Sequence, residues 1–155
     1  MLMYMSNSAP VARSTPRHSV SVAGVVVRDD GRLLAIRRAD NGAWELPGGV
    51  LELVETPEDG VRREVLEETG IHVEVDRLTG VYKNIVAGVV ALVFRCKVSG
   101  GVERVSDETT AVQWLTPEEV SERMSEVYAI RLLDAVDGGG PHVRSHDGRR
   151  LLKVH

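Results

Sequence analysis

The stretch "GGVLELVETPEDGVRREVLEETGI", residues 48–71, decides how the rest of the sequence is interpreted. Seven acidic residues fall inside it, although the whole chain has a formal net charge of only −4. They are Glu52, Glu55, Glu58, Asp59, Glu64, Glu67 and Glu68. Such a concentration of negative charge indicates either a solvated helix face or a place where a cation binds.

The second half of this stretch has the pattern of an α-helix with defined ends. Thr56 suits the N-cap position, and Pro57 suits the first helical turn. Asp59 completes a weak capping box, and Gly70 suits the C-terminal cap. We therefore expect a helix over about residues 57–69, preceded by a Pro-Gly-Gly loop whose backbone can approach a ligand closely.

Three of the acidic residues share one face of this helix. Glu64, Glu67 and Glu68 have the i, i+3, i+4 spacing of neighbouring side chains, which an ordinary surface helix also tolerates. Gly60 lies on the same face and leaves room for a ligand, at a cost of up to about 1 kcal/mol relative to alanine. Carboxylates held together resist joint ionisation, and Mg²⁺ binds oxygen ligands together with substrate phosphates. The residues therefore favour a Mg²⁺ or Mn²⁺ site for a phosphorylated substrate over a solvated acidic surface.

The spacing of these residues resembles the Nudix box without a departure. The matching residues are Gly49, Glu55, Arg63, Glu64, Glu67, Glu68 and Gly70, with apolar Val65 and Ile71. The resemblance extends over about residues 19–136, where "WELPGG" precedes the box and "SDETTAVQWLTPEE" follows it. It implies the Nudix fold, an α/β (α+β) domain with an α/β/α sandwich around a mixed β-sheet. It also implies an enzyme that hydrolyses a nucleoside diphosphate linked to another group, X.

The resemblance also implies a metal site and catalytic residues by matching position. The implied ligands of Mg²⁺ or Mn²⁺ are the Gly48 carbonyl, Glu64, Glu67, Glu68 and Glu108. Glu108, in "SDE", is also readable as an ordinary loop carboxylate. Either Glu64 or Glu108 is expected to accept the proton of the attacking water. Arg63 is included with the catalytic residues as a support that pairs with Glu55 or Glu67.

Four residues are candidates for substrate binding, and each has a plainer structural explanation. Arg37 and Arg38 follow a strand and either reach phosphate or remain solvated. Trp44 either packs under the Pro-Gly-Gly loop or lies at the edge of a pocket, and an aromatic side chain can do both. Tyr82 either contacts a base or belongs to the core.

The sequence leaves the substrate open. Enzymes that clear oxidised guanine nucleotides can use an asparagine of the last helix, but no asparagine follows Asn84 here. ADP-ribose hydrolases often carry a proline after the box, but none occurs between Pro57 and Pro117. A (d)NTP pyrophosphohydrolase is therefore our first expectation, followed by an ADP-ribose or nucleotide-sugar pyrophosphatase. A non-catalytic nucleotide-binding regulator is a further alternative, although such domains commonly lose a box glutamate.

The composition excludes several other classes of protein. With 43% hydrophobic and 27% charged residues, the 155-residue chain is typical of one soluble globular domain. Because acidic residues outnumber basic ones, 23 to 19, we expect no nucleic acid polymer as a partner. No segment is long enough to span a membrane. The single cysteine, Cys96, allows no internal disulfide and suits a cytoplasmic protein.

The remaining patterns outline the domain. Residues 1–17 are expected to form a flexible N-terminal tail, and residues 18–155 a single Nudix hydrolase domain. A hairpin is expected around residues 29–31, strands over about 72–85, 88–101 and 112–115, and a second helix over 116–136. A final hairpin is expected to turn at Asp147–Gly148, and a role in a homodimer and a free appendage fit it equally well.

Overall fold

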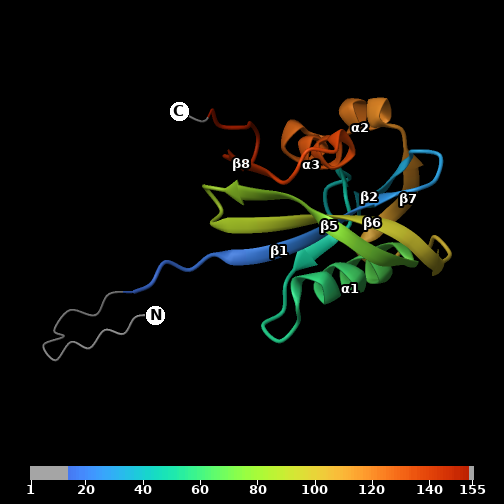
Figure 1. Cartoon of the computed structure of the whole chain (residues 1–155), viewed down its shortest axis with the longest axis horizontal. Coiled ribbons are helices and arrows are strands. Elements are labelled where there is room, and N and C mark those ends of the chain that lie inside the picture. The colour runs from blue at the N-terminus through green and yellow to red at the C-terminus, as the bar shows by residue number, and fades with distance from the viewer. Residues whose placement is uncertain (1–13, 154–155) are drawn as a thin grey trace, which may run out of the picture.

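The computed structural model describes residues 14–153, in which a mixed β-sheet lies between helices (Figure 1). The strands are β1 (Ser19–Val27), β2 (Leu33–Arg38), β3 (Trp44–Glu45), β4 (Gly48–Val50), β5 (Ile71–Asn84), β6 (Val89–Gly101), β7 (Thr109–Leu115) and β8 (His142–His146). The helices are α1 (Pro57–Thr69), α2 (Pro117–Arg123) and α3 (Glu126–Asp137). Helix α1 covers one face, and α2 and α3 lie on the other (Figure 1). The predicted α/β/α sandwich is confirmed.

Strand β1 is the centre of the sheet, whose order is β3-β2-β1-β6-β5-β8. It runs parallel to β6 and also pairs antiparallel with β4, while β7 pairs with β2. The β4 pairing sets Gly48 opposite Ala23, so the Pro-Gly-Gly loop begins beside the central strand. This register places the start of the acidic stretch next to the helix that carries its glutamates.

Alternate side chains of β1 enter two separate cores, as expected for a strand covered on both faces. Val22 and Val26 pack with α1, whereas Ala23 and Val25 pack on the side of α2 and α3. Gly24 faces α1, because a Cβ there would lie 3.0 Å from Val65 and 3.1 Å from Val61. This glycine therefore permits the close packing of α1 against the central strand.

The second predicted helix is wrong as a single element. The chain forms α2 and α3 instead, with Met124 in an extended conformation between them at φ −101° and ψ 150°. The Met124 side chain is nevertheless buried in the core on this face. Ser125 then occupies the N-cap position of α3, where serine is favoured. Helix-forming composition alone did not reveal this change of direction.

The two ends of the chain differ in how they relate to the sheet. Residues 14–18 are exposed and have no regular secondary structure, and the rest of the predicted tail lies outside the described residues. At the other end β8 pairs parallel with β5, so the alternative of a free C-terminal appendage is wrong. The predicted turn at Asp147–Gly148 brings Leu151 back to bridge His146.

A buried polar network holds β8 and α3 against β5. The Tyr82 hydroxyl donates a hydrogen bond to Asp134 over 2.8 Å, and Arg144 donates two more to the same carboxylate, each over 2.8 Å. Tyr82 is fully buried and Asp134 is 4% exposed. The expectation that Tyr82 contacts a substrate base is therefore corrected, because its polar end is used inside the fold.

Replacing Tyr82 with phenylalanine is expected to lower the free energy of unfolding by about 1 kcal/mol, the net value of one buried hydrogen bond. Catalytic rates should stay unchanged, because the side chain does not reach solvent. Urea unfolding measures the first effect and steady-state kinetics the second. Tyr128→Phe is the control, since no hydrogen bond joins the Tyr128 hydroxyl to another residue within 14–153. A changed KM in Tyr82→Phe alone would contradict the core assignment.

Candidate active site

Helix α1 begins and ends where the sequence predicts. The Thr56 hydroxyl accepts a hydrogen bond from the Asp59 amide over 3.1 Å, and Gly70 adopts a left-handed conformation with φ 78°. A Cβ on Gly60 would lie 2.8 Å from Leu51 and 3.0 Å from Glu55. Gly60 therefore serves contact between the helix and the preceding loop, rather than the approach of a ligand that its pattern suggested.

Arg63 ties the loop before α1 to the helix. Its Nε and Nη2 donate to the two carboxylate oxygens of Glu55 over 3.0 and 2.6 Å, which confirms the predicted pairing. Nη2 also donates to the Val50 carbonyl over 3.2 Å, and the Glu52 amide donates to Glu55 over 2.9 Å. The guanidinium holds the pKa of Glu55 well below its ordinary value, at about 2. Arg63 thus holds the loop against α1, and it does not line the pocket beside Glu68.

Two box glutamates are buried beneath the Pro-Gly-Gly loop. Glu64 and Glu68 are only 9% and 7% exposed, and the Gly48 amide donates to the Glu68 carboxylate over 2.7 Å. A Cβ at position 49 would overlap the Glu64 carboxylate, and one at position 48 would overlap the backbone of β1. Both glycines are therefore required for the loop to close over these acids.

Burial makes these two carboxylates difficult to ionise together. Desolvation, together with the nearby charges of Glu64, Glu108 and Glu45, raises the pKa of Glu68 to about 8, against the opposing effect of the hydrogen bond from the Gly48 amide. Desolvation also raises the pKa of Glu64, against the opposing effect of Arg63. The Glu68 carboxylate has no arginine or lysine within 4 Å among residues 14–153, although buried charges are normally paired. This chemistry fits a divalent cation that binds oxygen atoms.

The acidic side chains do not form a preassembled metal site. No group of three acidic, histidine or cysteine side chains within residues 14–153 is arranged to hold an ion as it stands. Glu67 is 58% exposed and lies 3.4 Å from Arg63, while Glu64 is 3.4 Å from the same guanidinium. Binding of an ion by all three glutamates would therefore require the Glu67 side chain to leave Arg63.

A pocket of about 410 Å³ opens beside Glu68. Its lining residues are Arg38, Ala39, Asp40, Glu68, Asp107 and Glu108. The Ala39 amide donates to the Glu108 carbonyl over 2.9 Å, and a β-bulge between Arg37 and Arg38 ends the regular pairing of β2 with β7. Bulges redirect side chains, and this one lies where the turn after β2 meets the loop before β7. The pocket therefore brings together Glu68, Glu108 and one basic side chain.

The other predicted substrate-binding residues do not line this pocket. Arg37 donates to the Gly42 carbonyl over 3.1 Å. Trp44 packs against the core on the α3 side, with the Arg123 guanidinium 5.6 Å from its ring centroid. Sequence reasoning missed Asp40 and Asp107. The signal for Asp40 was its position two residues after Arg38, a spacing at which the two side chains can pair.

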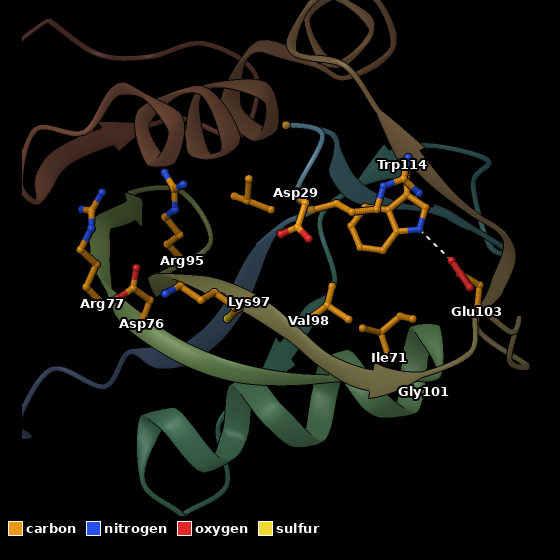
Figure 2. A pocket seen from close by; sticks show the side chains of 14 residues that line it. Asp29, Ile71, Asp76, Arg77, Arg95, Lys97, Val98, Gly101, Glu103 and Trp114 are labelled. Atoms are coloured by element: carbon orange, nitrogen blue, oxygen red, sulfur yellow. Dashed lines mark hydrogen bonds between the residues drawn. The ribbon is translucent and has the colours of Figure 1, made fainter.

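A larger cavity of about 830 Å³ lies where β1, β5, β6 and the end of β7 meet (Figure 2). Trp114 donates to Glu103 over 2.8 Å there, and the Arg28 guanidinium lies 4.9 Å from its ring centroid. Arg95, Lys97, Arg77 and Asp76 gather at one end of the cavity, and Trp114 and Glu103 lie at the other (Figure 2). None of the acidic box residues lines this cavity, whereas Glu68 lines the smaller pocket.

Comparison with known proteins decides the family, because the model of the NUDIX domain matches residues 17–135. The chain belongs to the Nudix family. A MutT-like protein of Streptomyces ambofaciens is 78% identical over 152 residues, which are 98% of each chain. An ADP-ribose pyrophosphatase of Methanocaldococcus jannaschii is 35% identical over 103 residues, 62% of this chain and 60% of that protein.

The solved structures agree on the fold. A Nudix hydrolase from Nitrosomonas europaea has a TM-score of 0.74 at 22% identity, with 92% of this chain and 87% of that chain covered. The predicted class of enzyme, a Nudix hydrolase that acts on phosphorus anhydrides, is confirmed. Within residues 14–153 no helix has the length and apolarity needed to cross a membrane.

Replacing Glu68 with glutamine is expected to stabilise this Nudix protein in the presence of a chelator. The pKa of Glu68 is about 8 when folded, against 4.5 ordinarily. Between these values the unfolded chain releases a proton that the folded chain keeps, so this carboxyl lowers stability progressively as pH rises. The variant should gain several kcal/mol near pH 8, because each pKa unit of the difference is worth about 1.4 kcal/mol, and less near pH 5.

Thermal unfolding with chelator and with Mg²⁺ measures this effect. Mg²⁺ should raise the Tm of the wild-type protein near pH 8 and raise that of Glu68→Gln much less. Glu58→Gln is the matched control, because Glu58 is an exposed carboxylate of the same helix. If the Tm of the wild type and that of Glu68→Gln depended equally on pH, Glu68 would not be the carboxyl whose pKa is raised by folding.

Proposed function

We propose that this protein is a (d)NTP pyrophosphohydrolase that uses Mg²⁺ or Mn²⁺ to cleave a phosphoanhydride bond and release a nucleoside monophosphate and pyrophosphate. The observation that carries the proposal is the buried Glu68 carboxylate, which has no arginine or lysine within 4 Å among residues 14–153. It lines a pocket together with Arg38 and Glu108. A substrate with several phosphates carries negative charge, and the divalent ion and Arg38 would both be needed to offset it.

The proposed metal ligands are Glu64, Glu67, Glu68, Glu108 and the Gly48 carbonyl. A divalent ion bound there would offset the charge of the phosphates and lower the pKa of a water molecule. Glu64 and Glu68 are already turned inward, and Gly48 and Gly49 leave the backbone free of side chains at this point. Arg38 is proposed to bind a phosphate through its planar guanidinium, which matches phosphate oxygens in pairs.

Glu108 is our choice between the two candidates for the general base. It lines the pocket, whereas Glu64 is folded against Gly49 and lies next to Arg63. A carboxylate that faces the pocket can accept the proton of a water attacking phosphorus. The hydrogen bond from the Ala39 amide to the Glu108 carbonyl would hold this residue at the pocket rim.

An ADP-ribose or nucleotide-sugar pyrophosphatase is the second candidate. It is favoured by the relative from Methanocaldococcus jannaschii, which is named an ADP-ribose pyrophosphatase. Aromatic residues make up only 4% of this chain, so a base held between two aromatic rings is difficult to build. Trp44 packs on the core and Tyr82 is buried, which leaves neither available to the pocket. A triphosphate held mainly through its charge suits this site better.

A nucleotide panel tests the proposal. Release of phosphate or pyrophosphate should be measured for the (d)NTPs, ADP-ribose and nucleotide sugars, with Mg²⁺ and with a chelator. Turnover should be greatest for a nucleoside triphosphate and should stop in chelator. Preferred hydrolysis of ADP-ribose would select the second candidate, and tight nucleotide binding without any turnover would select the regulator.

Variants of the box test the residue roles. Glu67→Gln and Glu68→Gln are each expected to lower turnover by at least ~10²-fold while the fold is retained, because an essential metal ligand is lost. Glu108→Gln should lower kcat strongly in the same assay, since the proton acceptor is removed. Glu58→Gln is the control with the same chemical change outside the pocket. Near wild-type rates in both Glu67→Gln and Glu68→Gln would show that the ligand assignment is wrong.

A further inference from the structure

The basic side chain in the active-site pocket is already paired with a carboxylate on the same turn. Arg38 Nε donates to Asp40 Oδ1 over 2.9 Å, and Arg38 Nη2 donates to Asp40 Oδ2 over 2.5 Å. Its remaining terminal nitrogen, Nη1, lies 3.7 Å from Glu45 Oε1. All three guanidinium nitrogens therefore face carboxylate oxygens, and the pairing lowers the pKa of Asp40 through its hydrogen bonds with Arg38.

The turn that carries this pair is fixed, whereas the pair itself is accessible. The Arg38 amide donates to the Ala43 carbonyl over 2.9 Å, and the Gly42 amide donates back to the Arg38 carbonyl over 3.0 Å. The Arg38 and Asp40 side chains are 42% and 61% exposed, and both line the pocket. The backbone thus keeps Arg38 and Asp40 at the wall of the pocket. Because their side chains are exposed, they can exchange partners with a ligand.

We propose that Asp40 is a positioning residue that competes with a substrate phosphate for Arg38. This inference rests on the proposed function, because it needs a diphosphate in the pocket. Carboxylate and phosphate offer the guanidinium the same pair of oxygen acceptors, so the Nε and Nη2 edge binds one of them at a time. Asp40 holds this edge in the free protein, and phosphate takes it when the substrate binds.

This exchange has a defined effect on binding. The pair must break before Arg38 can hold a phosphate with the same edge, so Asp40 raises the KM for the substrate. It also limits how tightly the phosphate products are retained. A residue with this role changes KM and product affinity and leaves the rate of the chemical step unchanged in single-turnover measurements, because it does not touch the reacting bond.

Replacement of Asp40 with asparagine tests the competition. The probe is inorganic pyrophosphate with Mg²⁺, and its binding is measured by isothermal titration calorimetry. The Asp40→Asn variant should bind it about two- to five-fold more tightly, the range expected when an exposed ion pair is removed. The KM of the best nucleotide substrate should fall by the same factor, with the single-turnover rate unchanged.

A double-mutant cycle separates competition for Arg38 from a general change of charge. In an Arg38→Met background, the Asp40→Asn substitution should improve pyrophosphate binding no more than Asp107→Asn does, because only the loss of pocket charge remains. Asp107→Asn removes another carboxylate from the same pocket, and no hydrogen bond or ion pair joins Asp107 to Arg38 in the described chain. Any gain in pyrophosphate affinity from Asp107→Asn comes from the reduced negative charge of the pocket, so it should persist in the Arg38→Met background.

A second control uses a pair of the same geometry elsewhere in the protein. Arg28 and Asp30 have the same spacing, with Nε–Oδ1 and Nη2–Oδ2 distances of 3.0 and 2.7 Å, and they lie outside this pocket. Asp30→Asn should leave pyrophosphate binding unchanged. The Tm of each variant confirms that its fold is retained.

Two results would overturn the proposal. Unchanged pyrophosphate affinity in Asp40→Asn would show that Asp40 does not compete for Arg38. An equal gain with and without Arg38 would show that only the pocket charge matters. Because pyrophosphate binding needs no turnover, a protein that hydrolyses no nucleotide would refute the proposed function while this cycle still gives its own answer.

Discussion

Burial of the Glu64 and Glu68 carboxylates beneath the Pro-Gly-Gly loop is the constraint on which the site depends. Two glutamates one helical turn apart face inward, where desolvation opposes their ionisation. The loop can close over them only because positions 48 and 49 lack side chains. In the absence of a cation this arrangement costs stability, as sites arranged for chemistry commonly do. These unfavourable carboxylates are the observation that supports our proposal of a metal ion bound by the box glutamates.

The rest of the fold holds this arrangement in place. Gly24 lets α1 pack closely on the central strand, and the pairing of β4 with β1 fixes the loop above the helix. Arg63 joins the loop to α1 through Glu55, so the buried glutamates cannot relax by moving the helix away. On the opposite side of the pocket, the turn after β2 is joined to Glu108 by a single backbone hydrogen bond. The site is thus held together by contacts among the Pro-Gly-Gly loop, α1, the central strand and the turn after β2.

Features with a local cause could be predicted from the sequence, and features that depend on tertiary contacts could not. The ends of α1 followed from Thr56 and Gly70, and the pairing of Arg63 with Glu55 followed from the spacing of the box. The break at Met124 was missed, and the choice between a core and a base-contacting Tyr82 stayed open, because packing on the sheet decides both. The pocket position of Asp40 was missed for a similar reason, since two separate loops meet there. The order of the acidic residues predicted a cation site, and both partners expected for Arg63, Glu55 and Glu67, lie within 4 Å of it in the fold.

The central claim is that one divalent ion joins the buried glutamates to a diphosphate. Electron paramagnetic resonance of bound Mn²⁺, titrated with and without pyrophosphate, tests this most directly. The account predicts one tight Mn²⁺ signal that pyrophosphate perturbs in the wild-type protein and that is lost when Glu68 becomes glutamine. A chain that binds no Mn²⁺ at these residues, or binds it equally well without the Glu68 carboxylate, would contradict the account.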